Sequence, residues 1–404
     1  IDHTPMDVIV VDEEDRQPIN RPYLTIVIDV FSRMILGFAI YLENPSAFTS
    51  GLAIAHAILP KDDWLHEMKV TADWPCWGKF RKLHCDNAKE FRGTVVGRAC
   101  GEHNITVEHR PKGRPRYGGH VERGFRTFMK RTQRLKGTTF SNTQQKLKYD
   151  SSGRAIMTRA ELERWFTIYI AKYYPNRFHW GIKDTPLARY KAGILGTNGH
   201  MGIGLPDPIR DPQRFMLDFM PYDERTVQDY GILLNHVYYY DDALRHWIRS
   251  KDPKEPTKPR KFIVRYVPRN MQEIHFLDPD TGEYIAIPYR DRSRPPVSYW
   301  EIKAAEDRLK EKGYANVNED LLFESILEMR EIEEEAEHLT KKARRKREKR
   351  NHQPAMPVKV GSQSTQPAAG APLANVDPAD QSGTPPAEKV EVLVEAFDGI
   401  VEPD

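Results

Sequence analysis

The sequence has very little cysteine and no long apolar run. Its 404 residues include three cysteines, Cys76, Cys85 and Cys100, without a CxxC pair. This argues against a zinc site and favours a reducing compartment. There is no run of about 18 apolar residues and no secretory signal, so we expect a soluble, intracellular, cytoplasmic protein. The 39% of hydrophobic residues allow a core in part of the chain, and the length predicts two folded domains and a tail.

Net charge is also small, at +3, until it is divided along the chain. The run KKARRKREKR at residues 341–350 holds eight cations and one glutamate, a net +7, which leaves −4 for the rest of the chain. Any affinity for nucleic acid must therefore come from local basic patches and not from the overall charge.

Two short acidic motifs are present, HCDNAKEF around Asp86 and GGHVERGF around Glu122. Residues 81–85 are short and apolar enough for a buried strand, which would place Asp86 at the strand's carboxyl end. Apolar residues at Val121, Phe125 and Phe128 follow helical spacing, so Glu122 is expected in a first helical turn. Two such carboxylates can converge on a divalent cation, which prefers hard oxygen ligands.

The preceding segments predict a mixed α/β sheet. Residues 6–12, 24–30 and 34–41 indicate three consecutive strands, and residues 46–59 a crossover helix with Ser46 as N-cap. A long aromatic loop at 61–80, a short helix at 94–103 and a strand at 105–109 follow. A third carboxylate is expected on an earlier strand of the same sheet, and Cys85 is interpreted as a buried packing residue.

The motifs IDHTPMDV, RPYLTIVIDVFSRMILGF, HCDNAKEF and GGHVERGFRT stand in this order. The sequence thereby resembles the DDE transposase and retroviral-integrase superfamily, within it the TnsB, TniA and MuA group. The resemblance implies an RNase H-like core with a mixed five-stranded sheet, and Asp2, Asp86 and Glu122 as catalytic residues and ligands of two Mg²⁺ ions, with Mn²⁺ as a substitute. Asp29 is the alternative to Asp2. Ala88 stands where the family usually has glycine.

The resemblance also predicts how the rest of the chain is divided into domains. It implies a catalytic core at residues 1–195, closed by a helix at 159–174 and the turn around His179, and a small β-barrel at 205–295. Short strands are predicted in this barrel, one of them at residues 232–240. A charged helical segment is expected at 298–350 and a disordered linker at 351–387. The apolar end, residues 388–404, is a candidate partner-binding segment through Val392, Leu393, Phe397 and Ile400.

The function implied is a DNA transposase that nicks transposon 3′ ends and joins them to target DNA. Candidate DNA contacts are the loop residues Lys112, Arg114, Arg116 and Tyr117 and the helix residues Arg123, Arg126 and Lys130. Implied partners are transposon-end and target DNA, an AAA+ ATPase regulator like TnsC or MuB, and further copies of the chain in a tetramer on DNA, at the bacterial nucleoid.

Two alternatives remain at this point. One is a non-catalytic assembly protein that pairs transposon ends, and the other is a retroviral-type integrase or nuclease. The chain starts inside the first motif, so we expect a fragment whose helix-turn-helix modules for end recognition precede it.

Overall fold

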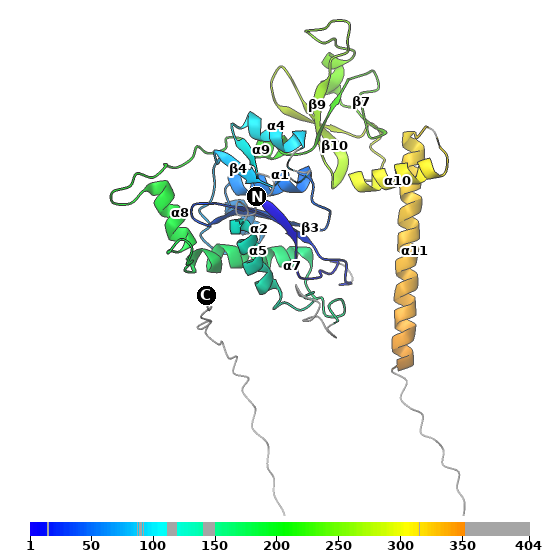
Figure 1. The fold of residues 1–404 in the computed structure, drawn as a ribbon. Coiled ribbons are helices and arrows are strands. Elements are labelled where there is room, and N and C mark those ends of the chain that lie inside the picture. Colours follow the sequence, from blue (N-terminus) through cyan, green and yellow to red (C-terminus); the bar gives the residue numbers. More distant parts are fainter. Residues whose placement is uncertain are drawn as a thin grey trace, which may run out of the picture. The chain divides into compact units, whose positions relative to one another are not determined.

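The computed structural model describes residues 1–13, 16–86, 88, 91, 93–110, 119–139, 150–314 and 316–351 (Figure 1). Within these ranges the side chains of residues 94, 120–122, 333 and 337–351 lie outside the description. The chain divides into one unit at Ile1–Leu339 and a second at Thr340–Asp404. In the described part of the chain, no helix combines the length and the apolar character needed to cross a bilayer.

The first part of the chain builds two small sheets in place of the single five-stranded sheet that the resemblance implied. Strands β1 (Asp2–Pro5), β2 (Tyr23–Ile28) and β3 (Ile35–Tyr41) pair antiparallel in that order, and β4 (Lys82–Cys85) pairs in parallel with β5 (Thr106–His109). The backbone nitrogen of Ile1 donates to the carbonyl of His84 at 2.8 Å, so β1 lies beside β4. This is the mixed α/β fold expected for an RNase H-like core.

The first predicted strand was misplaced. The ladder with β2 involves Asp2–Pro5, whereas residues 6–12 make only isolated bridges, for example between Val8 and Thr138. The nitrogen of Met6 still donates to the carbonyl of Pro22, but Val11 pairs with segments near residues 18 and 158 instead of continuing one ladder. The apolar run is nevertheless buried, because Met6, Val8 and Val10 are fully inaccessible. Burial alone does not produce a regular strand.

Helices cover both faces of these strands (Figure 1). They are α1 (Ala47–Ile58), α2 (Asp62–Glu67), α4 (Thr94–Glu102), α5 (Gly119–Thr132) and α7 (Arg159–Ile168), which continues as the π-helix η2 (Tyr169–Tyr173) and the 3₁₀ turn η3 (Tyr174–Asn176). In β2, Ile26 and Ile28 pack in one core with α5 and α7, while Val27 packs in another with α1 and α4. The alternation follows from the two-residue period of a strand.

Helix α1 is tied closely to the sheet, as predicted for residues 46–59. Ser46 is the N-cap, and its hydroxyl accepts from the nitrogen of Thr49 in a capping box. On β3, a Cβ at Gly37 would stand 2.4 Å from the backbone nitrogen of Ala57. Only glycine allows this approach of helix to strand.

The tryptophans of residues 61–80 serve packing, as predicted, although that segment contains helix α2 instead of being loop throughout. The indole of Trp74 donates to the carbonyl of Ile35 at 2.9 Å, and that of Trp64 to Thr167 at 3.1 Å. His56 lies against both rings. Burial, with a further contribution from the Lys61 charge, lowers the pKa of His56 from 6.5 to about 3.

His56 is expected to make the fold sensitive to acid. Its folded pKa is below its unfolded one, so the unfolded state takes up the proton first, and stability is lost as pH falls from about 6.5 towards 3. The loss reaches on the order of 4 kcal/mol at the acid end. Urea unfolding at a series of pH values should show that the free energy of unfolding falls less steeply below pH 6.5 in His56→Gln than in the wild type. The exposed His66→Gln is the control, and an equal slope in all three proteins would contradict the prediction.

A small β domain follows α8 (Pro186–Leu195) and α9 (Pro212–Asp218). Its strands are β6 (Tyr222–Arg225), β7 (Ile232–Leu234), β8 (Val237–Tyr239), β9 (Phe262–Val267), β10 (Asn270–Leu277) and β11 (Tyr284–Pro288), with the 3₁₀ turn η4 (Asp242–Trp247). They form a four-stranded antiparallel sheet in the order β11-β10-β9-β6 and a β7–β8 hairpin. One bridge, between Tyr239 and Tyr289, joins the two. Closure into a barrel stays a prediction.

Residues 232–240, predicted as one strand, form a hairpin. Asn235 and His236 both adopt positive φ, at 50° and 66°, which is the conformation of a two-residue type I′ turn. The asparagine was the available sequence signal, since it tolerates this conformation better than most residues.

The charged helices are not solvated throughout. Helices α10 (Tyr299–Glu311) and α11 (Glu319–Asn351) form where residues 298–350 were predicted to be helical. Ile302 and Ala305 of α10 and Leu322, Phe323 and Ile326 of α11 share one buried cluster with the strands of the β domain. The start of the predicted charged segment is therefore part of that domain's core.

Candidate active site

Asp2 and Asp86 come from two elements that the sheet places side by side. Asp2 opens β1 and Asp86 directly follows β4, the strands that the hydrogen bond from Ile1 to His84 joins. Both carboxylates act electrostatically on the same group, the thiol of Cys85. Asp86 Oδ1 accepts from the nitrogen of Ala88 at 2.9 Å, which orients the carboxylate. Two hard oxygen donors thus lie at one edge of the sheet.

Arg110 occupies the position next to Asp2. Its Nη2 donates to Asp2 Oδ2 at 3.1 Å, while Asp2 Oδ1 accepts from the nitrogen of His3 at 2.8 Å. Both side chains of this ion pair are only 14% exposed. Arg110 is held in place by its own backbone nitrogen, which donates to the carbonyl of Cys85. The guanidinium of Arg110 therefore neutralises the charge of the Asp2 carboxylate.

Glu122 lies in the first turn of α5, as predicted, and its side chain is outside the described residues. Two positions further on, a Cβ at Gly124 would stand 4.0 Å from Cδ1 of Ile28. The start of α5 thus passes the end of β2, in which Ile26 is the register partner of Asp2. Phe125, Phe128 and Met129 are buried as the helical stripe predicted. Among the side chains that are described, no group of three or more potential ligands gathers.

Asp29, the alternative to Asp2, is engaged in its own turn. Its Oδ2 accepts from the backbone nitrogen of Ser32 at 2.9 Å and from the Ser32 hydroxyl at 2.5 Å. Its position at the end of β2 is set by the turn into β3. The choice between Asp2 and Asp29 as a ligand stays a prediction.

Two families of known domains match the chain. The family model described as the TnsB C-terminal domain matches residues 1–137, a range that includes Asp2, Asp86 and Glu122. The model described as Mu transposase, C-terminal, matches residues 217–287, the strands of the small β domain. Parts of the chain are therefore similar to domains of the DDE transposase and integrase group.

Two curated members of this group align with most of the chain. The transposition protein TnsB of transposon Tn7 from Escherichia coli is 28% identical over 345 residues, which are 80% of this chain and 47% of that protein. The transposase for transposon Tn552 from Staphylococcus aureus is 24% identical over 294 residues, 70% of this chain and 54% of that protein. The chain spans about half the length of both relatives.

Solved structures with some similarity include two from retroviruses. The catalytic core domain of BIV integrase is 15% identical with a TM-score of 0.26, covering 47% of this chain and 91% of that one. The simian T-cell lymphotropic virus intasome in complex with the PP2A regulatory subunit B56 gamma is 13% identical with a TM-score of 0.26, covering 72% and 75%.

The predicted DNA and partner contacts divide into two sets. Arg123, Arg126 and Lys130 are exposed on α5, where they can reach a phosphate backbone. The other set lies outside the described residues, namely Lys112, Arg114, Arg116 and Tyr117 of the basic loop and Val392, Leu393, Phe397 and Ile400 of the C-terminal end.

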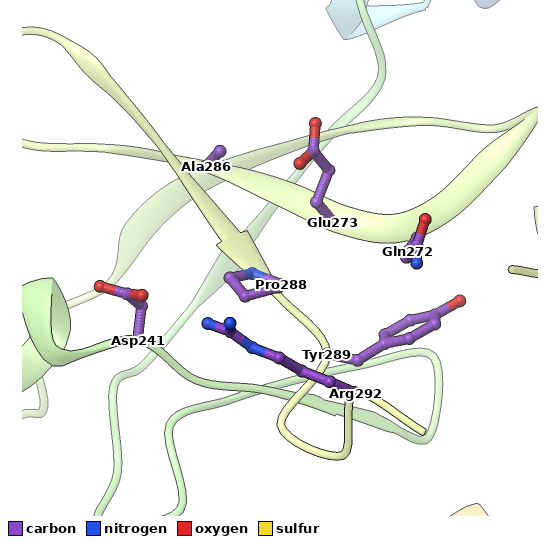
Figure 2. Close-up of a pocket in the computed structure, with 7 residues that line it drawn as sticks. All are labelled: Asp241, Gln272, Glu273, Ala286, Pro288, Tyr289 and Arg292. Atoms are coloured by element: carbon purple, nitrogen blue, oxygen red, sulfur yellow. The ribbon is translucent and has the colours of Figure 1, made fainter. Parts of the chain in front are cut away.

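A pocket in the β domain is unrelated to these residues. Its lining consists of Asp241, Gln272, Glu273, Ala286, Pro288, Tyr289 and Arg292 (Figure 2). None of the proposed ligands or DNA contacts lines it. We therefore do not assign the phosphoryl-transfer site to it.

Arg110 is the site residue that sequence reasoning missed. In the sequence it is only the cation that directly precedes residues 111–118 of the basic loop. The position immediately after β5 was the available signal, because the ends of parallel strands β4 and β5 meet at one sheet edge. Its partner Asp2 lies 108 residues away in sequence, which no local pattern reveals.

Proposed function

We propose that this chain carries the catalytic part of a DNA transposase, which nicks transposon 3′ ends and joins them to target DNA. The observation that carries the proposal is the hydrogen bond from Ile1 to His84, which brings the start of β1, with Asp2, beside β4, which Asp86 follows, within the range matched by the TnsB C-terminal model. Glu122, at the start of α5, is the proposed third carboxylate. The core at residues 1–195, the small β domain at 205–295 and the tail are its proposed domains.

The donor set fits a divalent metal. Asp2 and Asp86 offer carboxylate oxygens, and the guanidinium of Arg110 against Asp2 indicates that a positive charge is favoured there. Asp2, Asp86 and Glu122 would hold Mg²⁺ or Mn²⁺, and two such ions supply activation of the attacking oxygen and stabilisation of the leaving one. Asp86 is oriented for this by the nitrogen of Ala88.

The protein groups around the site support direct transfer without a protein nucleophile. Cys85 is the nearest thiol, and burial raises its pKa to about 11, so it stays protonated at neutral pH. Its Sγ lies 3.3 Å from Nδ1 of His109. The DNA is proposed to bind along α5 through Arg123, Arg126 and Lys130, together with the basic loop before that helix. The C-terminal end is proposed to bind the ATPase regulator.

A strand-transfer assay with the full-length protein tests the proposal. Labelled transposon-end DNA is mixed with a target plasmid and Mg²⁺, and covalently joined product is separated on a denaturing gel. Joining that depends on the divalent ion is expected. End binding without any nicking or joining would favour the assembly protein, and cleavage without joining would favour a nuclease.

Arg110→Gln is expected to tighten the binding of Mn²⁺ to the DNA-free protein. The guanidinium competes with a bound cation for Asp2, and removing one competing, largely buried ion pair corresponds to about tenfold in affinity. Isothermal titration calorimetry measures this independently of activity. Arg126→Gln, an exposed cation on α5, is the matched control. Equal affinities in wild type and Arg110→Gln would show that Arg110 does not compete at the metal site.

A further inference from the structure

An exposed aromatic pair follows the turn η3. Phe178 and Trp180 are 49% and 85% exposed, and their rings meet edge to face with centroids 5.2 Å apart. The turn that carries them is held by backbone bonds, from His179 to Asp184 at 2.9 Å and from Ile182 to His179 at 3.1 Å. The indole is therefore presented by an ordered turn and has almost no contact with the core. Such an exposed large apolar surface indicates a binding partner.

Tyr174 brings the elements around this turn together. Its hydroxyl donates to the carbonyl of Arg33 at 2.8 Å, and its ring packs edge to face on Phe128 of α5 with centroids 5.3 Å apart. Tyr174 itself begins η3 and is buried. The turn between β2 and β3, the second half of α5 and the turn η3 thus meet at one buried tyrosine.

Three arginines from these elements act electrostatically on His179. They are Arg33 after β2, Arg123 on α5 and Arg177 after η3, and Arg123 and Arg177 are exposed. The pKa of His179 lies below its ordinary value, first because the ring is partly buried and further because these three cations act on it. Asp29 also acts on Arg33, but its carboxylate is bound by Ser32. The surface is thus positively charged beside an exposed indole.

We propose that Arg33, Arg123 and Arg177 bind the phosphates of a DNA strand and that Trp180 stacks on an unpaired base of that strand. Guanidinium groups bind phosphate in a fixed bidentate geometry, and an indole stacks on any base whose face is free. The bases of intact duplex are stacked on each other, so the aromatic contact selects unpaired DNA. Arg123 directly follows Glu122, which ties this surface to the strand end at the proposed active site; in this respect the inference rests on the proposed function.

The test compares two DNA ligands without metal. A blunt duplex and the same duplex with a single-stranded extension are labelled, and their dissociation constants are measured by fluorescence anisotropy with the whole chain. Trp180→Ala is expected to bind the extended DNA about tenfold more weakly, given a stacking contribution of about 1–3 kcal/mol per base, and to bind the blunt duplex as the wild type does. Trp180→Phe should retain most of the affinity for the extended DNA.

Further variants separate the two kinds of contact. Arg177→Ala should weaken binding to both ligands and reduce the slope of log affinity against log salt by about 0.7 to 0.9. Trp300→Ala, which removes a 39% exposed tryptophan of α10, is the matched control and should change neither affinity. Thermal unfolding checks that each variant is folded.

Unchanged affinity of Trp180→Ala for the extended DNA would overturn the stacking proposal, and so would an equal loss on both ligands. An unchanged salt slope in Arg177→Ala would overturn its phosphate contact. Because the binding assay contains no metal and needs no chemistry, it can succeed even if strand transfer fails. Failure of this inference and failure of the proposed function are thus distinguishable.

Discussion

Asp86→Asn is expected to abolish both 3′ nicking and strand transfer. The substitution keeps the shape of the side chain and an oxygen that can accept the hydrogen bond from the nitrogen of Ala88. It removes the negative charge that a metal ligand needs. The loss of several kcal/mol of transition-state stabilisation lowers the rate by about a thousandfold or more. Gel separation of labelled end DNA measures both reactions, and calorimetric Mn²⁺ titration should show weaker binding in parallel.

Asp29→Asn is the matched control, because it makes the same shape-conserving change at another aspartate. The carboxylate of Asp29 accepts hydrogen bonds from Ser32 within its turn. It should retain joining activity, whereas Asp2→Asn should lose it as Asp86→Asn does. Joining by Asp86→Asn at the wild-type rate in Mg²⁺ would refute its assignment as a ligand. Activity lost in Asp29→Asn but kept in Asp2→Asn would show that Asp29, and not Asp2, is the ligand.

Arg265→Met is expected to destabilise the folded unit by about 3–5 kcal/mol, because it leaves buried polar partners uncompensated. Arg265 lies in β9 with its side chain 1% exposed. Its Nε donates to the hydroxyl of Tyr284 at 2.6 Å and its Nη1 to the carbonyl of Met220 at 2.8 Å. Asp218 completes the network, accepting from Tyr284 at 2.8 Å and lying 3.0 Å from Nε2 of His103.

The charge of Asp218 depends on these partners. Burial by itself raises its pKa, but the hydrogen bonds from His103 and Tyr284 and the charge of Arg265 outweigh burial and hold the pKa below its ordinary value. A lowered carboxyl pKa contributes stability above the unfolded pKa, and that stability is lost as pH falls through the folded one. In Arg265→Met the free energy of unfolding should therefore also change less as the pH is lowered.

Urea unfolding measures the effect of Arg265→Met. Arg269→Met is the control, since Arg269 pairs with Glu43 at 2.8 Å but its side chain is 38% exposed, and such a pair contributes about 0–1 kcal/mol. The double variant Arg265→Met with Asp218→Asn should lose less than the sum of the single changes, because the two residues share one network. Equal small losses for Arg265→Met and Arg269→Met would contradict the prediction.

Several elements were predictable because their signals are local. The capping box at Ser46, the helical stripe of Phe125, Phe128 and Met129, and the short apolar strand before Asp86 each depend on neighbours within a few residues. Where a local signal was ambiguous, the prediction failed. Residues 6–12 are as apolar as a strand, and residues 232–240 conceal a turn at Asn235 and His236.

The sequence by itself determined which residue types this protein has available for chemistry. The acidic motifs around Asp2, Asp86 and Glu122 and the basic residues of α5 were identified from pattern and resemblance, since motif and helical period are properties of the chain. Which of them meet was decided only by the tertiary structure. The hydrogen bond from Ile1 to His84, the contact of Arg110 with Asp2 and the contacts of Tyr174 join residues far apart in sequence. Such contacts form because strands and helices bury their apolar faces together, a condition on the whole chain that no short segment contains.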